Sequence, residues 1–146
     1  LDKFIGDAAM AVFNSPFDLE DYTYKAVKTA LDIQKCSEEI ARISHEKTGI
    51  KIGFGVGVNC GEAIIGNMGS EHRVEFAAIG DTVNTASRLE GVAKAGQVII
   101  SKKVYDRLKG RIDVTWLGNV SLKGKAKEVE IYQVNGLIDE KNEEDL

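Results

Sequence analysis

Asn84 and Arg88 are the two side chains whose types and spacing point most directly to chemistry. They lie four residues apart, so a helix would place them on one face, together with Asp81 at a position suited to an N-cap. An amide can both donate and accept hydrogen bonds, and a guanidinium offers a planar fork to phosphate oxygens. The same residue types are also ordinary on the polar face of a surface helix, so the pattern alone leaves both interpretations open.

The residues around this pair predict a strand followed by a helix within residues 73–90, RVEFAAIGDTVNTASRLE. Val74, Phe76 and Ala78 alternate with charged or small residues, as in a half-buried strand. Gly80 supplies a flexible turn, and the helix after it has apolar residues on the side opposite the polar pair. We therefore expect this helix to bury one face and to present the amide and the guanidinium on the other.

Asp7 and three lysines near the C-terminus are the other candidate groups. Asp7 would lie at the tip of a tight Gly-Asp turn between two short strands, residues 1–5 and 8–13. A carboxylate is a preferred ligand of Mg²⁺, but Asp is also common in turns for conformational reasons alone. The segment SLKGKAK contains the three lysines Lys123, Lys125 and Lys127. Such a run supplies local positive charge and is equally typical of a solvated turn.

Composition and charge indicate one compact domain. With 146 residues, 43% of them hydrophobic, the chain is long enough for one core and short for two. The net charge of −4 gives no general attraction to nucleic acid or anionic lipid. No apolar run approaches the ~18 residues that a membrane span needs, and the first residues do not resemble a signal peptide. Cys36 and Cys60 lack metal-ligand spacing, so we expect free thiols in a reducing, cytoplasmic compartment.

Two further segments predict parts of the core. Residues 18–45 carry apolar and small side chains, such as Ile33 and Ile40, at a spacing of three and four, which predicts a helix with that stripe against a sheet. Residues 51–59, KIGFGVGVN, alternate apolar residues with glycines. Three glycines on one face of a strand predict that another backbone, a helix, lies close against it. The turn after this strand predicts a hairpin with residues 62–66.

The rest of the chain predicts shorter elements. Strands are expected at residues 97–101, 111–117 and 129–134, a helix at 102–109, and a disordered acidic tail at 139–146. Strands and helices mix without regular alternation. The expected fold class is therefore α+β, with a mainly antiparallel sheet and its helices on one side.

Four segments, in order along the chain, resemble the catalytic domains of class III nucleotide cyclases, the adenylate and guanylate cyclases. They are KFIGD (3–7), GVGVNCGEAIIGNMG (55–69), IGDTVNTASRLE (79–90) and LKGK (122–125). The resemblance covers residues 1–134 and implies a ferredoxin-like cyclase fold, with 135–146 as a tail outside the domain. The chain starts without Met, with Leu1 already inside a predicted strand, and we expect it to be part of a longer protein.

The resemblance implies a role for each candidate residue. Asp7 matches the second metal aspartate of the family. Asn84 and Arg88 match the residues that orient the ribose and stabilise charge on the α-phosphate, and Lys123 matches the lysine that binds the triphosphate. The first metal aspartate belongs to a Phe-x-Asp-x-x-Gly-Phe-Thr motif that these 146 residues lack. We expect that aspartate upstream of Leu1, completing a site for two ions of Mg²⁺ or Mn²⁺.

The resemblance also bears on the choice of base. Lys3 falls where adenylate cyclases carry a lysine that donates to adenine and guanylate cyclases carry a glutamate. An ammonium has no acceptor, so it fits the acceptor edge of adenine. Ala77, seven residues before Asn84, departs from the Asp, Thr or Cys usual there and cannot accept from the adenine amino group. We therefore expect weak discrimination against GTP.

These inferences predict an adenylate cyclase catalytic domain that converts ATP to cyclic AMP and pyrophosphate. It is expected to act as a homodimer, with the metal aspartate of one chain facing the substrate-binding residues of its mate. Regulatory domains are expected upstream, and no contact with nucleic acid or, for these residues, with a membrane. The 146 residues alone are expected to be nearly inactive. The alternatives are a guanylate or unselective cyclase and a non-catalytic module that dimerises or binds nucleotide.

Overall fold

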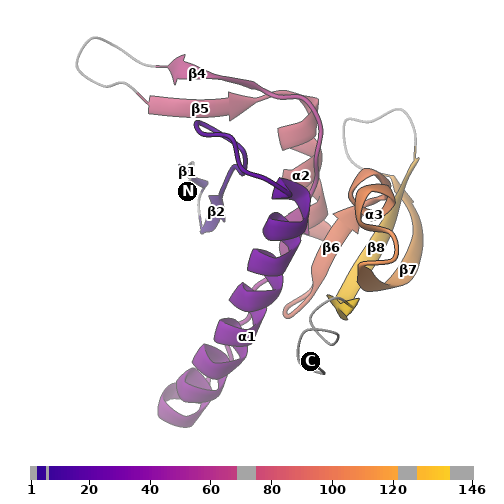
Figure 1. The fold of residues 1–146 in the computed structure, drawn as a ribbon. Helices are drawn as coiled ribbons and strands as arrows, with labels where there is room; N and C mark the ends of the chain where they lie inside the picture. Colours follow the sequence, from indigo (N-terminus) through magenta and orange to yellow (C-terminus); the bar gives the residue numbers. More distant parts are fainter. Residues whose placement is uncertain (1–2, 6, 69–74, 122–127, 139–146) are drawn as a thin grey trace.

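The computed structural model describes residues 3–5, 7–68, 75–121 and 128–138, without the side chains of residues 3–5, 67, 68 and 75–77. Within these ranges helices and strands alternate irregularly along the chain (Figure 1). The elements are β1 (Lys3–Ile5), β2 (Ala8–Met10), α1 (Tyr22–Thr48), β3 (Val56–Val58), β4 (Ile64–Met68), β5 (Glu75–Ile79), α2 (Asp81–Val92), β6 (Val98–Ser101), α3 (Lys102–Leu108), β7 (Ile112–Ser121) and β8 (Glu128–Leu137).

The central sheet has four strands in the order β3-β6-β8-β7. β3 and β6 pair in parallel, with Val56 opposite Val98, whereas β8 pairs antiparallel with both β6 and β7. The hairpins β1–β2 and β4–β5 are antiparallel and form two separate small sheets. The predicted α+β class with mainly antiparallel pairing is therefore confirmed.

Each face of the central sheet has its own buried core. Successive residues of a strand point to opposite faces. Val98 and Ile100 of β6 pack with side chains of α1 and α3, among them Leu108. Ile99, between them in the sequence, packs with Leu89 of α2. Helices therefore cover both faces, and the expectation that they all lie on one side is wrong.

The glycines of β3 and of the segment before it lie directly under α2. A Cβ built on Gly57 would overlap the backbone nitrogen of Glu90 and lie 2.8 Å from the carbonyl oxygen of Ala86. A Cβ on Gly55 would lie 2.8 Å from the carbonyl oxygen of Ala93. The predicted close approach of a helix backbone is confirmed, and the helix is the one that carries the polar pair.

α1 begins and ends later than the predicted helix, and it buries only part of the predicted stripe, its small residues Ala30 and Ser37. Ile33 and Ile40, expected to face the sheet, are 47% and 50% exposed. The buried residues of α1 are Thr23, Val27, Ala30, Gln34, Ser37 and Ala41. Nε2 of Gln34 donates to the carbonyl oxygens of Phe54 and Gln97, both at 2.9 Å. These two hydrogen bonds fix the rotation of α1 with its small and amide side chains toward the sheet.

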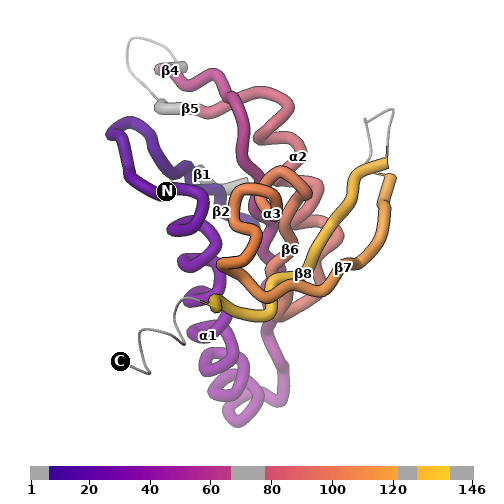
Figure 2. Tube along the Cα trace, turned by 45° about the vertical axis from the view of Figure 1, so that its right-hand side comes forward, coloured from indigo at the N-terminus to yellow at the C-terminus, as the bar shows by residue number. Residues whose placement is uncertain are grey.

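One of the two predicted hairpins is present. In β1–β2, Ile5 pairs with Ala8 across a two-residue turn, as predicted. The hairpin predicted between residues 51–59 and 62–66 is wrong, because β3 pairs with β6 and β4 pairs with β5. In Figures 1 and 2 the β4–β5 hairpin extends away from the central sheet.

The C-terminal strand is longer than predicted. β8 runs to Leu137, which is buried and lies opposite Ile112 of β7. The sheet thus extends past the expected domain boundary at residue 134. The tail expected at 139–146 lies outside the described residues.

The two cysteines differ in their exposure to solvent. Cys36 is exposed and Cys60 is buried, and both are free thiols, as the sequence predicts. Burial raises the pKa of the Cys60 thiol above its usual value.

None of the described helices combines the length and the apolar character that crossing a bilayer requires.

Candidate active site

The helix α2 follows β5 directly and takes Gly80 as its N-cap. Gly80 has a φ of +132°, a backbone conformation that residues with a side chain rarely adopt. Its carbonyl oxygen accepts the backbone N–H of Asn84 at 3.0 Å and closes the first turn. Asp81 is therefore the first helical residue and not the predicted N-cap. Its carboxylate lies at the helix end where negative charge is favoured.

Asn84 and Arg88 lie on the exposed face of α2, whereas Thr85 and Leu89 are buried. The predicted division of this helix into a buried and a polar face is confirmed. No side-chain hydrogen bond or ion pair joins Asn84 or Arg88 to another residue in the part of the chain that the structure describes. None of those residues therefore uses the hydrogen-bonding groups of the amide and the guanidinium, which can bind a ligand.

Asn59, which directly follows β3, forms a hydrogen bond with this helix that the sequence does not predict. Its side-chain Nδ2 donates to the carbonyl oxygen of Thr82, in the first turn of α2, at 3.1 Å. The sequence places it only at the end of the strand predicted at residues 51–59. The sequence feature that points to this residue is an Asn at the end of a strand with alternating apolar residues. This feature does not indicate which helix lies beside the Asn.

Asp7 is exposed in the turn of the β1–β2 hairpin. This hairpin is a sheet of its own, separate from the central sheet on which α2 packs. Among the described residues, no hydrogen bond or ion pair connects Asp7 with Asn84 or Arg88. One chain therefore does not join these three side chains into a bonded cluster.

The residues expected to contact the base and the triphosphate are only partly described. Lys3 is the first residue of β1, and Ala77 is the middle residue of β5. Their side chains lie outside the description. Lys123 belongs to residues 122–127, which also lie outside it. These three assignments therefore stay predictions.

Asp7 is the candidate metal ligand among the described residues. Within the described ranges, no three His, Cys, Asp or Glu side chains gather as a metal-binding group. Asp7 offers one carboxylate, and Mg²⁺ is held by one or two carboxylates together with substrate phosphates and water. The oxygen donor of Asp7 suits Mg²⁺ or Mn²⁺, but one carboxylate does not make a site for two ions.

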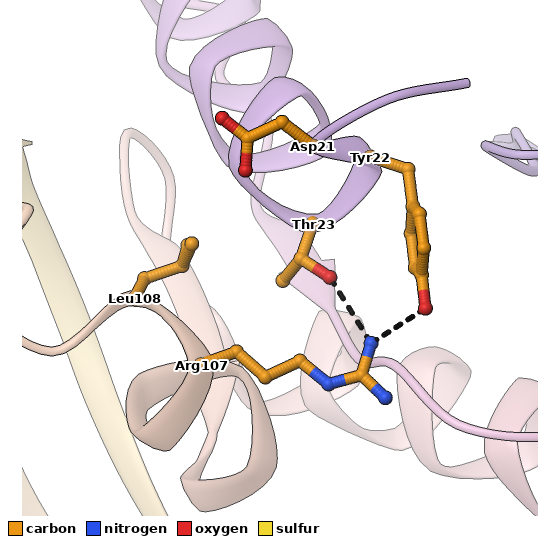
Figure 3. Close-up of a pocket in the computed structure, with 5 residues that line it drawn as sticks. All are labelled: Asp21, Tyr22, Thr23, Arg107 and Leu108. Atoms are coloured by element: carbon orange, nitrogen blue, oxygen red, sulfur yellow. Dashed lines mark hydrogen bonds between the residues drawn. The ribbon is translucent and has the colours of Figure 1, made fainter.

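A shallow pocket where the start of α1 meets α3 has a structural explanation (Figure 3). Nη1 of Arg107 donates to the hydroxyl of Tyr22 at 2.8 Å and to Oγ1 of Thr23 at 3.3 Å. Beside it, the Arg111 guanidinium donates to both carboxylate oxygens of Asp21 at 2.9 and 2.7 Å. This hydrogen bonding lowers the pKa of the Asp21 carboxyl. Arg107 thus fastens the start of α1 to α3, and Arg111 fastens it to the segment just before β7. None of the described candidate residues lines the pocket.

Comparison with known proteins identifies the family. The sequence profile described as adenylate and guanylate cyclase catalytic domain matches residues 3–136. The terminal-differentiation-specific adenylate cyclase of Dictyostelium discoideum is 35% identical over 139 residues, which are 92% of this chain and 6% of that protein. The chain thus spans a small part of the length of this relative.

Solved structures of both kinds of cyclase are similar to this fold. The guanylyl cyclase Cya2 has a TM-score of 0.86 at 29% identity, covering 93% of this chain and 69% of that one. The adenylyl cyclase CyaB from P. aeruginosa has a TM-score of 0.80 at 30% identity, covering 91% and 69%. The profile match, the sequence identity and the shared fold agree, and the chain belongs to the family of adenylate and guanylate cyclase catalytic domains.

Proposed function

We propose that this domain converts ATP to cyclic AMP and pyrophosphate at an active site shared between two copies of the chain. The observation that carries the proposal is the exposed face of α2. There Asn84 and Arg88 are both present, and neither side chain is bound by another described residue. A module that had lost catalysis would have no need for this pair, so the pair favours an enzyme over a purely dimerising or nucleotide-binding domain.

The reaction is an intramolecular phosphoryl transfer. The ribose 3′-oxygen bonds to the α-phosphorus, the bond from that phosphorus to the pyrophosphate oxygen breaks, and the 3′-hydroxyl proton is lost. Arg88 would stabilise the negative charge that develops on the α-phosphate, since its guanidinium donates parallel hydrogen bonds. Asn84 would orient the ribose through its donor and acceptor groups. Lys123 would bind the triphosphate.

Asp7 would hold a divalent cation, Mg²⁺ or Mn²⁺, from the turn of the β1–β2 hairpin. Such an ion, when bound, stabilises phosphate charge and favours loss of the 3′-hydroxyl proton. We place the second carboxylate ligand upstream of Leu1, because the Phe-x-Asp-x-x-Gly-Phe-Thr motif that carries it in the family does not occur in these 146 residues. The 146 residues alone are then expected to have little activity.

A second copy of the chain would bring the two halves of the site together. Asp7 is carried by one sheet and the polar pair by a helix on another. A two-fold symmetric dimer would place Asp7 of each copy against α2 of its mate, which creates two equivalent sites. Dimerisation is then a condition of activity and a point at which attached regulatory domains act.

ATP is the proposed substrate because Lys3 provides a donor suited to adenine, and because the Dictyostelium relative is named an adenylate cyclase. A guanylate or unselective cyclase is the second candidate. Ala77 favours it, since an alanine side chain cannot accept from the adenine amino group, and one similar solved domain is a guanylyl cyclase. A missing hydrogen bond of this kind costs about 1–3 kcal/mol, or roughly tenfold or more in selectivity.

We also propose a cytoplasmic location and regulatory domains upstream in the same protein. The free thiols of Cys36 and Cys60 are typical of a reducing compartment. The small share of the Dictyostelium protein that this chain covers leaves most of that protein for other domains.

The test is to compare kcat/KM for ATP and GTP in a protein extended upstream through the expected aspartate. With Mn²⁺ the account predicts cyclic AMP formation, a preference for ATP, and complete loss of activity on chelation with EDTA. Equal values for ATP and GTP would contradict the adenylate assignment, and no turnover of either would overturn the cyclase itself. If residues 1–146 alone are as fast as the extended protein, the upstream carboxylate is wrong.

A further inference from the structure

The side-chain amide of Asn59 connects two helices. Its Nδ2 donates to the carbonyl oxygen of Thr82 in α2 at 3.1 Å, and its Oδ1 accepts from Oγ of Ser101 at 2.7 Å. Ser101 is the N-cap of α3. A side-chain amide can donate to one group and accept from another at the same time. Asn59 therefore joins the start of α2 to the start of α3.

The carbonyl oxygen of Thr82 determines which way this amide is turned, because it can only accept a hydrogen bond and so takes the Nδ2 donor of Asn59. The amide oxygen is thereby left facing Ser101, whose hydroxyl donates to it. The Ser101 side chain is buried, and its Oγ also accepts from the backbone nitrogen of Val104 at 3.4 Å.

The same turn holds Thr82 at a second point. Oγ1 of Thr82 donates to the carbonyl oxygen of Glu62 at 2.5 Å. Gly61 has a φ of +147°, and a Cβ there would lie 2.7 Å from Oγ1 of Thr82. Residues 59–62 therefore contact the first turn of α2 through both its backbone and a side chain.

We propose that Asn59 is a positioning residue for the cyclase reaction. By holding the carbonyl group of Thr82, it fixes the first turn of α2 and so the direction of the Asn84 side chain, two residues further on. This inference rests on the proposed contact of Asn84 with the ribose. The rest of α2 is held by Leu89 in the core and by the close approach of Gly57. Loss of the Asn59 bond is therefore expected to shift the first turn without releasing the helix.

The test uses the extended protein with ATP as substrate. Asn59→Ala is expected to lower kcat by roughly 10- to 100-fold, because a shift of about 1 Å in a positioning group has effects of this size. KM should change by less than about threefold, since the triphosphate contacts remain. Asn59→Asp should resemble Asn59→Ala, because a carboxylate cannot donate to Thr82. Unchanged kcat in both variants would overturn the proposal.

Asn135 offers a matched control. Its Nδ2 donates to Oγ1 of Thr115 at 3.0 Å, an exposed bond between β8 and β7. Asn135→Ala also removes a hydrogen bond that an asparagine Nδ2 donates, but away from α2 and to a side chain. Its kcat should stay within about twofold of the wild-type value. A loss in Asn135→Ala equal to that in Asn59→Ala would show that general destabilisation, and not positioning, explains the effect.

A double variant separates positioning from other damage. If Asn59 acts through Asn84, adding Asn59→Ala to Asn84→Ala lowers kcat no further. Multiplication of the two losses would overturn the proposal. If Asn59→Ala does not fold, Asn59→Asp, which loses the donor to Thr82, carries the test, and an unchanged kcat in that variant would then be the contrary result. No turnover of ATP or GTP by the wild type would overturn the proposed function and, with it, this role.

Discussion

Gly57 and Ala86 approach so closely that a Cβ on the glycine would lie 2.8 Å from the carbonyl oxygen of the alanine. The strand β3 and the helix α2 thus touch backbone to backbone. This contact sets how far the exposed face of α2 stands above the sheet. The position of Asn84 and Arg88 therefore depends on a strand residue that has no side chain.

Replacing Gly57 with Ala should destabilise the fold by about 1–3 kcal/mol, because the added methyl group meets backbone atoms of α2 that cannot move separately. Urea denaturation of the purified protein measures the change. Gly91→Ala, on α2 itself, is the control, since no atom of the described residues lies within 4 Å of a Cβ built there, apart from its chain neighbours and the adjacent helix backbone. It should stabilise by about 0.5–1 kcal/mol. Identical midpoints for Gly57→Ala and wild type would contradict the close packing.

Replacing Arg88 with Ala should lower kcat/KM for ATP by about 100-fold or more, since loss of a donor to developing charge has effects of this size. Arg88→Lys should recover little, because an ammonium lacks the planar fork. Steady-state kinetics of the extended protein measure both. Arg42→Ala, an exposed arginine paired with Glu39 and Glu46 on α1, should leave the kinetics unchanged. Wild-type activity in Arg88→Ala would contradict the proposed role of Arg88 in stabilising charge on the α-phosphate.

Replacing Lys3 with Glu should lower the ratio of kcat/KM for ATP to that for GTP by about tenfold or more, because the acceptor replaces a donor at the base. The measurement is competition between the two nucleotides in the extended protein. Lys28→Glu reverses the charge of an exposed lysine on α1 and should not change the ratio. An unchanged ratio in Lys3→Glu would show that this position does not contact the base.

The Asp21–Arg111 pair predicts a small dependence of stability on pH. Hydrogen bonding to Arg111 lowers the pKa of the Asp21 carboxyl from 3.8. A carboxyl with a lowered folded-state pKa adds stability above its unfolded-state pKa, and this contribution is lost as the pH falls through the folded-state value. Both side chains are at least 36% exposed, so the contribution is less than about 1 kcal/mol.

Asp21→Asn should therefore lower the free energy of unfolding by this small amount at about pH 6, and by less at about pH 3, where the carboxyl of the unfolded chain is largely protonated. Urea denaturation at the two pH values measures the difference. Lys102 and Asp106, an exposed pair within α3, offer Asp106→Asn as a control for an ion pair that does not join two elements. A difference between Asp21→Asn and wild type that is the same at both pH values would contradict the account.

Local patterns predicted the elements that depend on local chemistry. The hairpin at Asp7, the start of a helix after Gly80 and the exposed position of Arg88 all follow from spacing and turn residues. The glycine face of residues 51–59 likewise predicted that a helix backbone would lie against it. The family could be inferred because the motifs keep their order along the chain.

The errors in the predicted fold come from contacts between distant segments. The rotation of α1 depends on hydrogen bonds from Gln34 to Phe54 and Gln97, and no spacing within the helix contains that information. β3 and β6, which pair with each other, lie on either side of α2 in the sequence. The hairpin prediction considered only the next strand along the chain as a partner for β3, and it was therefore wrong. The contact of Asn59 with Thr82 joins residues 23 positions apart, and no local pattern predicts it.

The central claim, that one active site takes residues from two chains, is tested most directly by mixing two inactive variants of the extended protein. Asp7→Asn and Arg88→Ala should each be inactive alone. After equal mixing and subunit exchange, about half of the dimers contain both variants, each with one intact site of two, so about a quarter of the wild-type activity should return. If mass spectrometry shows mixed dimers and no activity returns, the shared site is contradicted.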